Sequence, residues 1–97
     1  MVKGEPKAAY VLIKCEIDRR PEIVKKLMQV EGIDEIQKTY GEYDIIVRIT
    51  GEFEKIKSNI RSKICQQSHV RGTITLFYKD TIEQHERVEQ IVNEIVA

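Results

Sequence analysis

The chain has 97 residues, enough for one domain with a modest hydrophobic core. Its 16 basic and 16 acidic residues balance to a net charge of zero, and no segment gathers the Lys and Arg residues of a nucleic-acid interface. Charged residues interrupt every apolar run and the N-terminus lacks a signal-peptide core, so we expect a cytoplasmic protein without membrane contact. Cys15 and Cys65 lie far apart and indicate no disulfide framework.

The first part of the chain predicts a lead-in, a strand and a helix. Residues 1–7 have no hydrophobic period and are expected to form a flexible lead-in. Residues 8–17 alternate, which predicts a strand with these residues on one face: Val11, Ile13, Cys15 and Ile17. Pro21 suits a first helical turn, and apolar residues then recur at helical spacing until Gly32, so we expect a helix over residues 21–30.

Two further strand patterns, residues 33–40 and 43–50, flank Gly41 and predict a hairpin. Gly41 can adopt the positive φ that a tight turn requires. Asp44 then has two interpretations. It is either part of a polar hairpin tip or a carboxylate that points into a small-molecule site.

The last part of the chain predicts helix, strand and helix. From Glu52 the spacing is helical and is expected to continue to Gln67, with one apolar stripe of Phe53, Ile56, Ile60 and Ile64. Residues 70–79 alternate as a fourth strand, with Thr73, Thr75 and Phe77 on one face. Thr81 and Gln84 resemble a capping box, which predicts an amphipathic C-terminal helix over residues 81–97.

These elements form two similar strand–helix–strand halves, which predicts an α+β fold, the ferredoxin-like βαββαβ sandwich, over residues 8–80. Its four-stranded antiparallel sheet carries both helices on one face, and the C-terminal helix is an addition. The other face is expected to expose apolar residues such as Tyr10, Leu12 and Phe77, or the residues that alternate with them. A second copy of the chain or the C-terminal helix would cover that face.

A family resemblance rests on the order of these elements and on four short stretches: Gly32-Ile33, Gly41-Glu42-Tyr43-Asp44, Ile45-Ile46-Val47, and Val70 with Thr73-Ile74-Thr75. With them, the chain resembles the effector-binding (RAM) domain of the Lrp/AsnC family of feast/famine transcription regulators. The resemblance implies a dimer formed through the sheets, a ring of dimers that is commonly octameric, and an amino acid or similar small metabolite bound between dimers. We expect no required cofactor and no catalytic residue.

Carried over to this chain, the resemblance implies that Gly41, Tyr43 and Asp44 bind the effector together with Thr73 and Thr75. A carboxylate can pair with an α-ammonium group, and threonine hydroxyls can hold an α-carboxylate. The alternative for the two threonines is that they are ordinary β-branched strand residues.

The chain departs from the family in two places. Full-length members carry a helix-turn-helix domain that reads DNA, and there is no room for one ahead of Ala8. We therefore expect a stand-alone RAM protein that regulates transcription or metabolism through partners, such as full-length Lrp/AsnC regulators, rather than by binding DNA itself. The family often has Pro-Gly before the valine of the last strand, where this chain has Ser68-His69-Val70.

Two alternatives from other functional classes remain open. Cys65 and His69 have a spacing that could supply two ligands to copper or zinc, as in a small metal-binding regulator. Their other interpretation is a buried free cysteine beside a helix-capping histidine. A cofactor-free dimeric enzyme of the same fold is the second alternative, with Tyr10, Tyr40, Tyr43 or His69 as its working group. We expect no enzyme, because no catalytic constellation or phosphate loop is recognisable.

Overall fold

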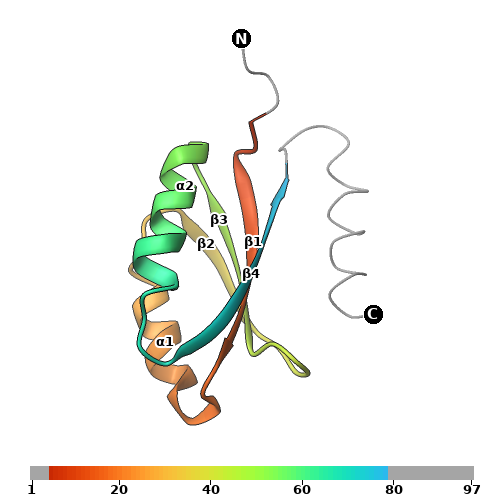
Figure 1. Ribbon diagram of the computed structural model, residues 1–97, viewed down its shortest axis with the longest axis vertical. Helices are drawn as coiled ribbons and strands as arrows, with labels where there is room; N and C mark the ends of the chain where they lie inside the picture. The colour runs from red at the N-terminus through yellow and green to blue at the C-terminus, as the bar shows by residue number, and fades with distance from the viewer. Residues whose placement is uncertain (1–4, 79–97) are drawn as a thin grey trace.

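The computed structural model describes residues 5–78, which form one four-stranded antiparallel sheet with two helices on one face (Figure 1). The strand order is β2-β3-β1-β4. The elements in chain order are β1 (Ala8–Cys15), η1 (Ile17–Arg19), α1 (Arg20–Leu27), β2 (Ile33–Lys38), β3 (Ile45–Thr50), α2 (Phe53–Asn59), η2 (Ile60–Ile64) and β4 (Val70–Tyr78). This confirms the ferredoxin-like α+β fold. The expected C-terminal helix over residues 81–97 and most of the lead-in lie outside the described residues.

The core lies between the sheet and the helices and is aliphatic. The alternation in the two central strands puts one side of each under the helices, as the sequence predicts. Val11 and Ile13 of β1 meet Val47 and Ile45 of β3 directly across the ladder, and all four are buried. The helices contribute Ile23, Leu27, Ile56, Ile60 and Ile64 to the same cluster. Pro21 lies in the first turn of α1, where its missing N–H costs no hydrogen bond.

The first strand ends earlier than its alternation predicts. Its pairing with β4 shifts register between Lys14 and Cys15, and the Arg19 amide then donates to the Glu16 carbonyl at 2.9 Å in the short 3-10 turn η1. Ile17, expected on the buried face, is consequently 62% exposed. The alternation in the sequence therefore extends two residues beyond the end of β1, because the bulge changes the direction of the chain.

Both helices also differ from their expected extents. The first ends at Leu27 rather than Val30, since the next residues form turn hydrogen bonds that lead into Gly32. The second is α-helical only to Asn59 and continues as the π-helical segment η2 up to Ile64. Helical periodicity in the sequence cannot distinguish an α-helix from a short π-helical segment at its end.

The side of the sheet assigned to Phe77 was wrong. Phe77 lies directly opposite Ala9 of β1, a core residue, and its ring contacts the Phe53 ring of α2 edge-on, with centroids 5.1 Å apart. Phe77 is therefore on the helix side. The opposite face carries Tyr10 and Leu12 beside Ile74 and Leu76 of β4. Leu12 was expected to be exposed there but is buried, whereas Ile74 is 43% exposed.

Candidate functional site

The loop between β2 and β3, residues 39–44, is longer than the short link that the hairpin pattern predicts. The Thr39 amide donates to the Asp44 carbonyl at 2.9 Å, and the Thr39 hydroxyl donates to the Tyr43 carbonyl at 2.7 Å. Gly41 at the tip has φ +117°, which confirms its predicted role as the turning residue. Tyr43 and Asp44, expected to open the third strand, instead lie in this loop.

Asp44 links the loop to the end of β1. Its amide donates to the Ile13 carbonyl at 2.9 Å, and its Oδ2 accepts a hydrogen bond from the Cys15 amide at 2.9 Å. The Asp44 carboxylate therefore satisfies the Cys15 amide beside the β1 bulge, which is a structural function. Burial, followed by the nearby Asp44 carboxylate, raises the pKa of the Cys15 thiol. A carboxylate can accept further hydrogen bonds beyond this one, so Asp44 keeps acceptor capacity for a ligand.

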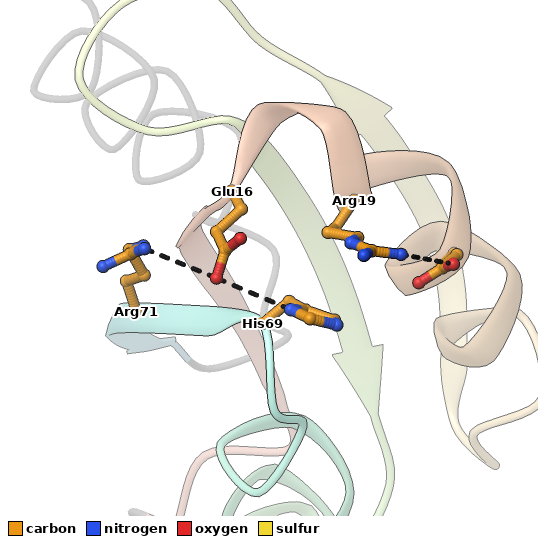
Figure 2. A network of polar contacts seen from close by, with 5 residues as sticks. Glu16, Arg19, His69 and Arg71 are labelled. Carbon is orange, nitrogen blue, oxygen red and sulfur yellow. Dashed lines mark hydrogen bonds and ion pairs between the residues drawn. The ribbon is translucent and has the colours of Figure 1, made fainter.

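The start of β4 lies at the same end of the sheet as Asp44. The Glu16 amide donates to the His69 carbonyl at 3.2 Å, directly after Cys15. The Glu16 carboxylate is 3.5 Å from Nδ1 of His69 and 3.4 Å from the Arg71 guanidinium (Figure 2). These side chains are partly exposed, so the pairs contribute little to stability. Asp44, Glu16 and the first residues of β4 thus form one polar end of the sheet.

Thr73 and Thr75 lie elsewhere on the sheet. They face Ile13 and Val11 across the β1–β4 ladder, which places them on the helix side, and Thr73 Oγ1 is 3.5 Å from Cys65 Sγ. Strand β1 separates them from β3, the strand that Asp44 precedes. The described chain therefore brings Gly41, Tyr43 and Asp44 together in one loop and does not add the two threonines to them.

Cys65 and His69 have different neighbours. Cys65 contacts Thr73, whereas His69 contacts Glu16. Cys65 is exposed, so the interpretation of it as a buried cysteine was wrong; Cys15 is the buried one. Within residues 5–78 no three His, Cys, Asp or Glu side chains gather as a metal site would require.

The comparison with known sequences points to one kind of protein. No family model matches the chain. The chain is 29% identical over 79 residues to the HTH-type transcriptional regulator FL11 of Pyrococcus furiosus, an alignment that covers 77% of this chain and 52% of that protein. FL11 of Pyrococcus abyssi is 29% identical over 84 residues, covering 82% and 56%. The chain spans about half the length of the curated relatives it matches.

Solved structures repeat the architecture. Escherichia coli AsnC superposes with a TM-score of 0.72 at 18% identity, covering 81% of this chain and 54% of that one. FFRP-DM1 superposes with a TM-score of 0.70 at 26% identity, covering 74% and 97%. The NMB0573/L-Met complex from Neisseria meningitidis superposes with a TM-score of 0.70 at 11% identity, covering 82% and 54%. The described chain has the fold of these Lrp/AsnC-type structures.

The domain carries a polar network on the face opposite the helices, which sequence reasoning missed. Arg48 Nε donates to Tyr78 Oη at 2.7 Å, and Arg48 Nη1 donates to Asp34 Oδ2 at 2.6 Å. The hydrogen bond to Tyr78 raises the pKa of the Arg48 guanidinium further. The Tyr78 ring stacks on Tyr10 with centroids 5.4 Å apart. The signal in the sequence was an arginine alternating with the buried residues of β3.

No helix within residues 5–78 is long and apolar enough to span a bilayer.

Proposed function

We propose that this RAM domain is a regulatory module that binds an amino acid or a similar small metabolite, with Gly41, Tyr43 and Asp44 contributing to the site. The observation that carries the proposal is the Asp44 carboxylate. It is held by the Cys15 amide at the polar end of the sheet and keeps acceptor capacity for an α-ammonium group. The L-Met complex of a protein with the same fold supports this ligand class.

Self-assembly is the second part of the proposal. Thr73 and Thr75 are on β4, and β1 lies between them and β3, the strand that follows the Asp44 loop. One chain therefore does not form the whole predicted site. A neighbouring copy would supply the missing side. The face opposite the helices, with a half-buried Tyr10 and a 43% exposed Ile74, suits a homodimer, from which an octameric ring can be built.

Regulation would then follow from assembly and partner choice. A ligand that contacts two copies prefers the assembled state, and this preference shifts the population of assemblies. The named relatives are transcription regulators, and we propose that this cytoplasmic module acts through such partners rather than as an enzyme. Its balanced charge of 16 basic and 16 acidic residues supports the absence of direct DNA binding.

The test is a thermal-shift screen of the twenty amino acids with light scattering on each hit, followed by calorimetric titration of two variants. Asp44→Asn retains an oxygen acceptor for the Cys15 amide but removes the charge. We expect it to keep the melting temperature and to weaken binding about tenfold or more, as loss of a charge-assisted contact does.

Glu42→Gln is the matched control, because Glu42 is an exposed carboxylate of the same loop. Its affinity should equal that of the unmodified chain. Equal affinity for Asp44→Asn and the unmodified chain would remove Asp44 from the site, and absence of any amino-acid hit would contradict the proposed ligand class. Copper and zinc belong in the same screen, because stabilisation by metal alone that is lost in Cys65→Ser or His69→Ala would favour the metal-binding alternative.

A further inference from the structure

A second concave surface lies between the second helix and strand β4, away from the Asp44 loop. This α2–β4 recess has a volume of about 270 Å³ and is lined by Lys57, Ile60, Arg61, Cys65, Thr75 and Phe77. Four of these residues belong to the α2–η2 helix or follow it directly, and two belong to β4. Figure 1 shows this helix on the same side of the sheet as α1, and the contact between Phe53 and Phe77 connects it to β4.

The floor of the α2–β4 recess is apolar and rigidly held. Phe77 is 37% exposed, and its ring meets the Phe53 ring edge-on at a centroid distance of 5.1 Å. The Lys57 ammonium group lies 4.5 Å from the Phe53 centroid. An aromatic face that stays partly exposed beside Ile60 can contact the apolar body of a ligand.

The charge of the recess is positive. Lys57 and Arg61 are two cations among its lining residues, and no lining residue is acidic. The Lys57 ammonium group forms an ion pair with the Glu54 carboxylate at 3.3 Å. Arg61 forms no ion pair with another residue of the 5–78 region. The Thr75 hydroxyl adds a neutral hydrogen-bonding group. This combination favours an anion, in contrast to the acidic groups at the Asp44 end of the sheet.

The backbone beside the recess is also unusual. In η2 the Cys65 amide donates to the Ile60 carbonyl at 2.9 Å, five residues back, which is the π-helical pattern. Single π-helical turns within helices are rare and frequently occur at functional sites. Here the turn carries Arg61 and ends beside Cys65, two of the residues that line the recess.

We propose that the α2–β4 recess binds a small organic anion, a carboxylate joined to an apolar or aromatic body. Arg61 and Lys57 hold the carboxylate, Thr75 donates to it, and Phe77 and Ile60 contact the body. The recess shares Thr75 with the residues that the resemblance assigns to the effector. It goes beyond the proposed amino-acid function because it needs no ammonium group on the ligand and does not use Asp44.

Benzoate is a suitable probe, and two-dimensional ¹H–¹⁵N NMR of the whole chain is the readout. Titration should shift the amides of residues 57–65 and 75–77 and slow the labelling of the exposed Cys65 by a thiol reagent. Arg61→Gln should weaken benzoate binding about fivefold, as expected for one partly exposed charged contact. Lys57→Gln should weaken it to a smaller extent, since Lys57 is shared with Glu54.

Lys55→Gln is the control for general loss of charge, because Lys55 is an exposed residue of the same helix outside the recess. It should bind benzoate as the unmodified chain does, and uncharged benzyl alcohol should bind much more weakly. Equal benzoate affinity in Arg61→Gln and Lys55→Gln, shifts confined to the Asp44 loop, or no shifts at all would overturn the proposal. Asp44→Asn should leave benzoate binding unchanged, so this proposal and the amino-acid proposal fail in distinguishable ways.

Discussion

The two faces of the sheet are built from the same strands and stabilised in different ways. On the helix side, aliphatic side chains such as Ile13, Ile45 and Ile56 pack with almost no exposed surface. On the other side, Arg48 connects Asp34 to Tyr78 by directional hydrogen bonds. Packing on the helix side therefore supplies most of the stability of the domain. The other side leaves hydrogen-bonding groups available for contacts with another molecule.

The largest effect should come from a cavity on the helix side. Ile13 is fully buried on the central strand β1, so Ile13→Ala should lower the free energy of unfolding by about 2–4 kcal/mol. Ile46→Ala on the opposite face removes the same atoms and should cost less than about 1 kcal/mol, as substitutions of less buried residues usually do. Urea unfolding of both variants measures the difference.

The protein concentration sharpens this test. If copies assemble through the face opposite the helices, the cost of Ile46→Ala should grow with concentration, whereas the cost of Ile13→Ala should not change. Equal costs for the two variants at low concentration would contradict the division between the faces.

A smaller loss of stability is expected from a substitution at Gly32, just before β2. Gly32 has φ +95°, and a Cβ there would lie 2.8 Å from the Thr50 carbonyl oxygen and 3.3 Å from the Ile49 side chain. Gly32→Ala should therefore lower the free energy of unfolding by about 1–3 kcal/mol through strain and crowding. Gly41→Ala is the control, since φ is also positive there but the surrounding space is open. Thermal unfolding should rank Gly32→Ala as the less stable variant, and the reverse ranking would contradict the crowding argument.

The smallest effect concerns the pH dependence of the face opposite the helices. Burial and the neighbouring Tyr78 raise the pKa of Tyr10 above its ordinary value of 10.0. Because the folded state holds this proton more tightly than the unfolded state, the contribution is complete below pH 10 and is lost as the pH rises through the raised value. Tyr10→Phe should reduce the loss of stability above pH 10, measured by urea unfolding across that range. An unchanged pH profile would show that Tyr10 does not titrate differently in the folded state.

Local pattern was sufficient for most of the architecture. Alternation on β1 and β3 predicted which side of these strands the helices cover. Pro21 marked the start of a helix, and Gly32 and Gly41 marked turns that the structure contains. Errors occurred where a distant group intervened. The Cys15 amide bonds to the Asp44 carboxylate instead of continuing the strand pattern, and Phe77 takes its side of the sheet from its pairing with Ala9.

The candidate sites were less predictable for the same reason. Gly41, Tyr43 and Asp44 are near neighbours in sequence and lie in one loop, whereas Thr73 and Thr75 were expected beside them and lie on the helix side of β4. Lys57 and Arg61 of the α2–β4 recess lie outside the apolar stripe of their helix, and nothing in the sequence connects them to Phe77.

The sequence by itself determined the order of the elements, the buried side of the central strands and the position of the hairpin turn. These follow from periodicity and from the conformations that single residues allow, both of which are local properties. Only the tertiary structure decided that Asp44 meets Cys15, that Arg48 reaches Tyr78 across β1, and that Arg61 lines a recess with Phe77. These contacts depend on strand order and register, which are fixed by packing between residues far apart in the chain.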